Sequence, residues 1–281
     1  MRSIQLSLFT VSLLTACGSS GDDTGDATGE PGDTGDTDEP GDTSGRTSGD
    51  ASGADTDDPT DEPPPGSCAL VPVPCADAAV QDLSLQDDKI SAVAVANTRD
   101  GDDWVSTVDA SAGGTMGAAM NPWVYLRFGD DGLTRVDLDD VSAIDSAAWD
   151  IAAKRYGVRV NSGTSGGSCV AVAELGGAYA DVAAAPAADA FAVERYYDDA
   201  CALIEDGSGL PGNPDFRMKR WWGYTGCVTT TNVPFAVRLA DGRHLKLVIE
   251  AYYQEGQDAC NTSGAMGTGS AIMTWRWSFL P

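Results

Sequence analysis

The sequence predicts a mainly β protein, with one domain of antiparallel strands and minor helix preceded by an acidic, disordered tether. Three observations lead to this fold class. Apolar and polar residues alternate repeatedly from Trp123 onward, which is typical of strands with one buried face. Turn-forming residues separate these segments at short intervals. Residues 18–66, by contrast, contain no valine, isoleucine, leucine or aromatic residue, so this stretch cannot offset its ordering entropy by burial.

The first residues have the pattern of an export signal. Arg2 is followed by a short apolar run, Ile4 to Leu14, which is too short to span a bilayer as a helix. Leu14-Thr15-Ala16-Cys17 then resembles a bacterial lipobox, which implies cleavage after residue 16 and acylation of Cys17. Several acyl chains on one residue anchor a protein stably. We therefore expect a signal peptide at 1–16 and a lipid anchor at Cys17.

Residues 17–66 form the expected tether between the anchor and the domain. The part from Gly18 to Gly66 holds 15 acidic residues against Arg46 alone, or −14 of the net charge of −26. Self-repulsion extends such a chain, so we expect a spacer that holds the domain away from the membrane. Gly18-Ser19 places no acidic residue beside the cysteine, and by the enterobacterial rule this indicates the outer membrane.

The same charge pattern limits the partners. No basic run or patch is visible, so nucleic acid is excluded as an expected partner. An anionic membrane surface repels the acidic chain, so the expected contact with the membrane is the lipid anchor itself.

Six cysteines remain for the domain over residues 67–281. An even number in an exported chain favours three disulfides. Six cysteines allow 15 pairings and the sequence does not choose among them, although a short loop could join Cys68 and Cys75. The six are Cys68, Cys75, Cys169, Cys201, Cys227 and Cys260.

The strands are expected where the alternation is clearest. Gly129-Asp130-Asp131-Gly132 and Ala240-Asp241-Gly242 read as hairpin turns. Met273, Trp275 and Trp277 alternate with polar residues in a final strand with an aromatic face. The expected strands cover residues 123–128, 133–138, 157–160, 169–175, 234–239, 243–253 and 273–279. Residues 145–156 fit either a helix or a strand, and the alanine-rich stretch 178–192 fits a short helix.

Three segments resemble the HmuY family of haem-binding bacterial lipoproteins. The first is Trp149–Gly163 (WDIAAKRYGVRVNSG), the second Trp221–Tyr224 (WWGY), and the third Phe235–Leu247 (FAVRLADGRHLKL), followed by Tyr252-Tyr253. Together with the aromatic final strand they cover most of the domain. The resemblance implies an all-β fold with a cleft and capture of haem, which would be passed to an outer-membrane receptor.

The resemblance also implies axial ligands, and here the sequence departs from the family. The best-known member uses two histidines and others use methionines, whereas this chain has one histidine, His244, expected on a solvated strand face. Bis-histidine ligation by one chain is therefore excluded. Methionine and tyrosine can both ligate haem iron, so Met218 and Tyr224 are the candidate ligands, near Trp221 and Trp222.

Other candidates compete with that pair. Tyr196, Tyr197, Met116 and Met120 are further potential ligands, and for every methionine packing in the aromatic core is the alternative. The main alternative function is a cell-surface interaction module that binds a protein, a glycan or another apolar ligand. It predicts Met218 in the core or on an exposed surface, and no opening large enough for haem.

Enzymatic chemistry has little support in the sequence. A hydrolase needs a nucleophile and a positioned base, and His244 is the single histidine. Acidic stretches such as Asp100–Asp103 and Asp137–Asp140 read as surface turns rather than glycosidase pairs. No phosphate-binding glycine motif and no zinc spacing of cysteines is present. We therefore expect a binding protein and not an enzyme.

Overall fold

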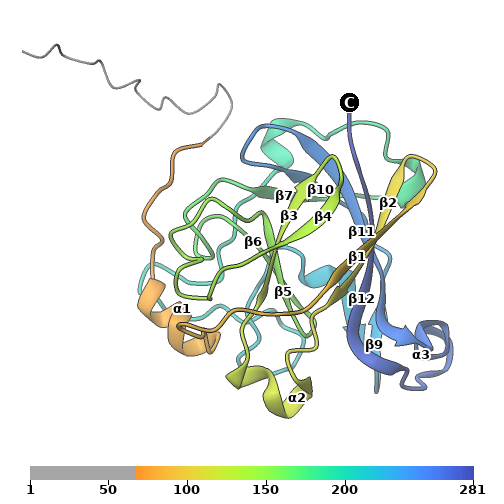
Figure 1. Ribbon diagram of the computed structural model, residues 1–281, viewed down its shortest axis with the longest axis horizontal. Coiled ribbons are helices and arrows are strands. Elements are labelled where there is room, and N and C mark those ends of the chain that lie inside the picture. Colours follow the sequence, from red (N-terminus) through yellow and green to blue (C-terminus); the bar gives the residue numbers. More distant parts are fainter. Residues whose placement is uncertain (1–67) are drawn as a thin grey trace, which may run out of the picture. The chain divides into compact units, whose positions relative to one another are not determined.

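The computed structural model describes residues Cys68–Pro281 and shows a mainly β domain of antiparallel sheets with three short α-helices (Figure 1). The expected signal peptide, Cys17 and the tether lie outside the described residues. Among the residues that are described, no helix is long and apolar enough to cross a membrane.

The larger sheet has six strands in the order β1-β2-β12-β11-β10-β7, and all its pairings are antiparallel. Its strands are β1 (Val95–Asp100), β2 (Asp103–Asp109), β7 (Ala171–Glu174), β10 (Phe235–Arg238), β11 (His244–Glu255) and β12 (Thr268–Phe279). The long strands β11 and β12 form its centre (Figure 1). Their register shifts twice between Ile249 and Tyr253, and both Tyr252 and Tyr253 are buried there.

The second sheet has four antiparallel strands in the order β4-β3-β5-β6. They are β3 (Val124–Gly129), β4 (Gly132–Val136), β5 (Ile151–Lys154) and β6 (Gly157–Val160). The Asn97 side chain joins the two sheets at their edges, since its amide donates to the Leu133 carbonyl at 2.9 Å and its oxygen accepts from the Leu133 N–H at 3.0 Å.

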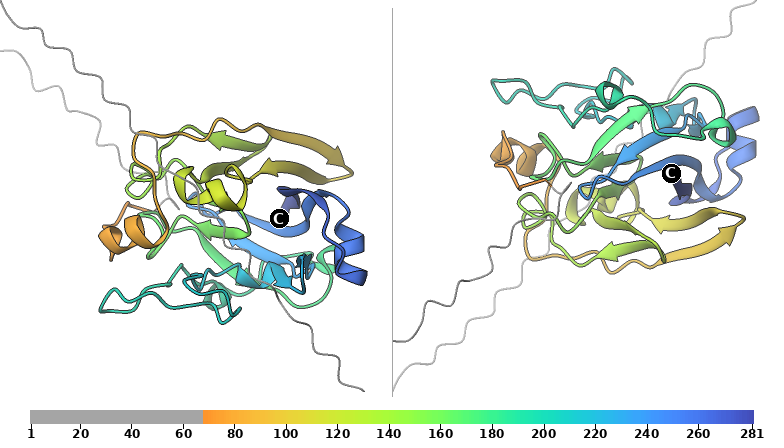
Figure 2. Two further views of the ribbon diagram at one scale, coloured as in Figure 1. Left: turned by 90° about the horizontal axis from the view of Figure 1, so that it is seen from below. Right: turned by 90° about the horizontal axis from the view of Figure 1, so that it is seen from above.

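The remaining elements are short. They are the β8–β9 hairpin (Trp222–Tyr224 and Val228–Thr230), helices α1 (Ala76–Asp82), α2 (Gly114–Gly117) and α3 (Gln257–Ser263), and four single turns of 3₁₀-helix, η1 (Ala118–Met120), η2 (Tyr179–Asp181), η3 (Ala188–Ala190) and η4 (Lys219–Trp221). The largely irregular chain near residue 200 covers the side of the domain opposite the β1–β2 hairpin (Figure 2).

Both faces of the four-stranded sheet are buried, because alternate residues point to two different cores. Val124 and Leu126 pack with Trp275 and Trp277 of the larger sheet, and Phe128 meets the Trp277 ring edge-on at 4.9 Å. On the other face Trp123, Tyr125 and Ala152 pack with residues of α1 and the loops. This double burial explains why β5 and β6 contain no exposed residue.

All six cysteines of the domain are paired. Cys68 bonds to Cys169, Cys75 to Cys201 and Cys227 to Cys260. The expected three disulfides are therefore present, and the short loop suggested between Cys68 and Cys75 is not. Each of these two residues instead ties the start of the domain to a segment more than 100 residues away.

Most expected strands are confirmed. Residues 157–160 match β6, and the hairpins at 129–132 and 240–242 join β3 to β4 and β10 to β11. The ambiguous stretch at 145–156 contains β5 and no helix. The stretch at 178–192 holds only two single turns of 3₁₀-helix, η2 and η3, which are shorter than the helix its alanines favour.

Candidate functional site

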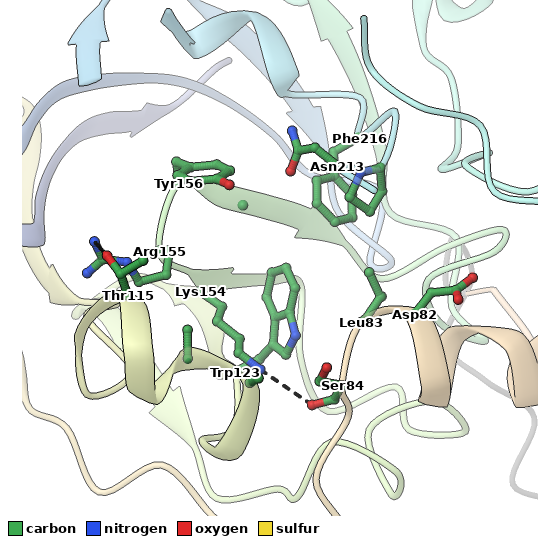
Figure 3. Close-up of a pocket in the computed structure, with 14 residues that line it drawn as sticks. Asp82, Leu83, Ser84, Thr115, Trp123, Lys154, Arg155, Tyr156, Asn213 and Phe216 are labelled. Carbon is green, nitrogen blue, oxygen red and sulfur yellow. Dashed lines mark hydrogen bonds between the residues drawn. The ribbon is translucent and has the colours of Figure 1, made fainter. Parts of the chain in front are cut away.

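A pocket of about 280 Å³ opens beside the turn between β5 and β6 (Figure 3). The turn forms one wall, and the segment containing α2 and η1 forms another. The end of α1 and the residues just before Met218 complete it. Its lining comprises Asp82, Leu83, Ser84, Thr115, Ala118, Ala119, Trp123, Lys154, Arg155, Tyr156, Gly157, Asn213, Pro214 and Phe216.

The tight β5–β6 turn places two cations and an aromatic ring at the pocket. Lys154 pairs with Gly157 across the turn, so Arg155 and Tyr156 lie at its tip. Arg155 has a φ of 54°, a left-handed conformation that a side chain adopts at some cost. A Cβ atom at position 157 would lie 3.0 Å from the Trp123 ring, so glycine here allows the turn to pack tightly against that tryptophan.

Aromatic side chains form the apolar walls. The rings of Trp123 and Phe216 meet edge-on, with centroids 5.8 Å apart. The Tyr156 ring packs against Trp222 at 4.6 Å, and the Trp221 indole donates a hydrogen bond to the Tyr156 carbonyl at 3.1 Å. These contacts fix the rings from behind, so the walls are formed before any ligand arrives.

Lys154 is the unusual polar residue of the pocket. It is only 8% exposed, and its Nζ donates a single long hydrogen bond of 3.4 Å to the Ser84 carbonyl (Figure 3). Within residues 68–281 no carboxylate forms an ion pair with it. Burial lowers the pKa of Lys154 to about 8, although Asp140 attracts the charge. The positive charge of the Lys154 amine is thus only weakly balanced by other groups of the described chain.

A second cation, Arg159, lies fully buried behind the pocket. Its guanidinium carbon is 4.8 Å from the centre of the Trp123 ring and 5.3 Å from that of Trp149. It donates to the Ser165 carbonyl at 3.0 Å and to the Tyr125 hydroxyl.

Asp140 connects this arginine to the pocket wall. The carboxylate accepts hydrogen bonds from the Tyr125 hydroxyl at 3.0 Å, the Trp123 N–H at 2.9 Å and the Gln86 N–H at 2.9 Å. Arg159, Tyr125 and Asp140 therefore form a continuous chain of hydrogen bonds that ends at the backbone of Trp123. This arrangement has a structural role, since it fixes a residue that lines the pocket.

The structure does not bring the two candidate iron ligands together. Met218 is fully buried in the main core, whereas Tyr224 is 58% exposed on β8. Tyr224 lines a different pocket, of about 340 Å³, with Trp222 and Lys219, and Met218 lines neither pocket. Their role as ligands stays a prediction.

The other residues considered as ligands are equally dispersed. Tyr196 and Tyr197 are buried, and Met116 and Met120 are exposed on the segment that includes α2 and η1. His244 is half-buried on β11 and packs against Phe191 at 5.3 Å. Residues 68–281 contain no group of three or more histidine, cysteine or acidic side chains that could hold a metal ion.

The pocket suits the organic part of a haem better than its iron. Trp123, Tyr156 and Phe216 offer apolar surface for a flat ring, and Lys154 and Arg155 offer charge for its carboxylates. No histidine, methionine or cysteine lines it. Tyr156 alone has an oxygen of a type that ligates haem iron, and burial raises the pKa of this phenol. The lining therefore fits the ring and its acid groups but not a pair of axial donors.

Sequence reasoning missed the residues that form this pocket. Trp123 lies in a segment read only as strand. Lys154 lies in the stretch read as helix or strand and within the first family-like segment, but it was not singled out as a site residue. Phe216 lies in a segment given no structure. One signal was present, since Lys154 is the sole charged residue of the apolar run 151–154. That Lys154 has no ionic partner among the described residues can be seen only in the tertiary structure, where the loops surround it.

Residues 119–264 match the family model described as HmuY protein. The fold is an antiparallel β-sheet domain with a pocket lined by aromatic and cationic side chains, and the chain belongs to the HmuY family, a haem-binding, non-catalytic family. No curated protein matches the sequence.

Several solved structures are similar to the chain at low identity. A proposed HmuY-like haem-binding protein from Bacteroides vulgatus is 19% identical, covers 63% of this chain and 91% of its own, and has a TM-score of 0.39. A proposed lipoprotein from Bacteroides fragilis is 16% identical, with coverages of 64% and 90% and a TM-score of 0.38. The apo HmuY analogue of Tannerella forsythia is 13% identical, with coverages of 69% and 100% and a TM-score of 0.37. These scores are too low to carry any of those proteins' functions to this chain.

Proposed function

We propose that the chain is a lipid-anchored protein of the bacterial cell envelope whose domain captures haem or a related tetrapyrrole without bis-histidine ligation. Membership of the HmuY family is the observation that carries the proposal. The pocket beside Trp123 supports it, because aromatic walls and two cations suit a flat, anionic ligand. The captured ligand would then pass to an outer-membrane receptor.

Haemin titration of the full-length protein in non-ionic detergent tests this function. The Soret band is followed in both redox states, with a detergent-only titration subtracted. We expect a saturable shift at one haemin per chain. The absence of a saturable shift beyond the detergent-only titration would overturn the proposal.

Three substitutions test the candidate ligands in the same titration. Met218→Leu removes the sulfur while keeping the buried volume, so a spectral change cannot be attributed to an emptied core. Tyr224→Phe and Tyr156→Phe each remove one phenolic oxygen. A shifted or lost Soret band in one variant identifies that residue as a ligand, and an unchanged band in all three excludes them.

The anchor is tested separately. Cys17→Ser removes the proposed acylation site and leaves the domain unchanged. We expect the wild type in the membrane fraction, chiefly the outer membrane, and the Cys17→Ser protein outside it. Equal membrane retention of the two proteins would contradict lipid anchoring at this residue.

Two observations favour a second function, a cell-surface module that binds a protein, a glycan or another apolar ligand. Met218 lies in the core, and the pocket of about 280 Å³ falls just below the usual range of about 300–1,000 Å³ for ligand sites. The pocket would therefore hold only one edge of a tetrapyrrole ring. If haemin does not bind specifically, the interaction module explains the structure better than haem capture does.

A further inference from the structure

We propose that the pocket beside Trp123 recognises a carboxylate on a flat apolar body, with the Lys154 amine as the anion anchor, and that this recognition does not depend on a metal ion. The inference rests on the proposed function and specifies the chemistry of the same site. It differs from iron ligation in predicting that a metal-free ligand binds.

Lys154 is a buried lysine with no ionic partner within the described chain. Lysine is almost never so deeply buried unless it is paired, and here the amine has one weak hydrogen bond and no ion pair within the described chain. A buried ammonium without a partner is unfavourable, because nothing replaces the hydration that it has lost. An incoming carboxylate would supply that partner in a site of reduced dielectric, where a charged hydrogen bond is strong.

Aromatic rings surround the pocket that the amine lines. Trp123 lies beside the amine, the Phe216 ring stands edge-on to Trp123, and Tyr156 lies across the pocket (Figure 3). A flat ring can pack on these faces while its acid group reaches Lys154. Arg155, on the same turn, carries a second positive charge and also forms no ion pair within residues 68–281.

The charges around Lys154 do not neutralise it. Asp140 attracts the ammonium, whereas Arg159 and Lys89 repel it. Asp140 already accepts three hydrogen bonds, from Tyr125 and from the N–H groups of Trp123 and Gln86. Asp82, at the end of α1, accepts the Tyr197 hydroxyl at 2.9 Å and lines the pocket. Neither carboxylate forms an ion pair with Lys154, so the pocket retains excess positive charge.

Burial also sets the pH range of binding. Because the pKa of Lys154 is lowered to about 8, the amine is charged at neutral pH and loses its proton just above it. Carboxylate affinity should therefore fall between about pH 7 and pH 9. The Tyr156 phenol stays neutral over this range because burial raises its pKa.

The test uses the full-length protein in detergent and three probes: metal-free protoporphyrin, its dimethyl ester, and 2-naphthoate as a small aromatic acid. Lys154→Met removes the charge while keeping an apolar chain. Lys246→Met is the matched control, since Lys246 lines a separate groove on the larger sheet. We expect Lys154→Met to weaken the free acid at least tenfold and to leave the ester unchanged, with Lys246→Met like wild type. Unchanged ester binding also shows that the variant is folded.

The outcomes separate this inference from the haem function. Haemin binding without any binding of metal-free protoporphyrin would leave the haem function standing and overturn metal-independent recognition. Equal losses of acid and ester in Lys154→Met would overturn the anchor role of Lys154. Lys154-dependent binding of 2-naphthoate, with neither haemin nor protoporphyrin bound, would support the carboxylate site and overturn the haem function. No binding of haemin or of any of the three probes would overturn both.

Discussion

The guanidinium of Arg159 lies 4.8 Å from the ring centre of Trp123, so a fully buried charge rests against a residue that lines the pocket. The same arginine donates to the Tyr125 hydroxyl, which in turn donates to Asp140. The core charge and the pocket wall are thus parts of one arrangement. A substitution of Arg159 should therefore lower the free energy of unfolding and disturb the position of Trp123.

Arg159→Met tests that arrangement. Removing one member of a buried charged network leaves the others uncompensated, and we expect a loss of about 3 kcal/mol in the free energy of unfolding. Urea unfolding followed by circular dichroism measures it. Arg195→Met is the control, because Arg195 is exposed and forms only an exposed i,i+4 pair with Asp199. A change below about 0.5 kcal/mol for Arg159→Met, as expected of surface sites, would contradict a structural role.

Glu194 should make stability fall as pH rises. Its buried carboxylate accepts hydrogen bonds from the N–H groups of Val160 and Arg217, yet burial raises its pKa to about 7 from its ordinary value near 4.5. The folded state therefore holds the proton more tightly than the unfolded state. The stabilisation is complete below about pH 4.5 and is lost by about pH 7, a loss on the order of 3 kcal/mol.

Urea unfolding of the wild type and Glu194→Gln at pH 5, 6, 7 and 8 checks this dependence. The variant should show a flatter profile, because glutamine does not titrate. Part of the slope should remain, since burial also raises the pKa of Asp150 to about 6. Parallel profiles for the two proteins would show that Glu194 does not titrate in this range.

Disulfide mapping tests how the start of the domain is held. We expect peptides that link Cys68 to Cys169, Cys75 to Cys201 and Cys227 to Cys260 after proteolysis without reduction. Mass spectrometry before and after reduction identifies them. A peptide that links Cys68 to Cys75 would contradict the way α1 is tied to the loop around residue 201, and with it one wall of the pocket.

Sequence patterns predicted those strands whose buried and exposed residues simply alternate along the chain. In β12, Met273, Trp275 and Trp277 are buried and their polar neighbours are less so, as the alternation required. The β1–β2 hairpin was missed because Val95–Asp100 is mostly exposed and its pattern is weak. Strict alternation along β11 would place Tyr252 on the same face as His244, but the register shifts beside Tyr252 bring it into the core. Such shifts depend on the partner strand and leave no periodic signal.

The site was less predictable than the fold. The sequence directed attention to Met218, just before a family-like motif, and to Tyr224, the last residue of that motif. Their actual burial depends on contacts with distant strands. The pocket is formed by segments far apart in the chain, from Asp82 to Phe216. Cysteine count predicted three bridges, but only the tertiary fold selects one of 15 pairings.

The most direct test of the account is whether filling the pocket beside Trp123 abolishes ligand binding. Ala118→Trp places a large side chain on the pocket wall, and Ala180→Trp places the same side chain in the separate groove on the larger sheet. Isothermal titration calorimetry with haemin, on the full-length protein in detergent, gives both affinities. The account predicts at least a tenfold loss for Ala118→Trp and wild-type affinity for Ala180→Trp. Equal, undiminished binding by both variants would show that haem binds elsewhere.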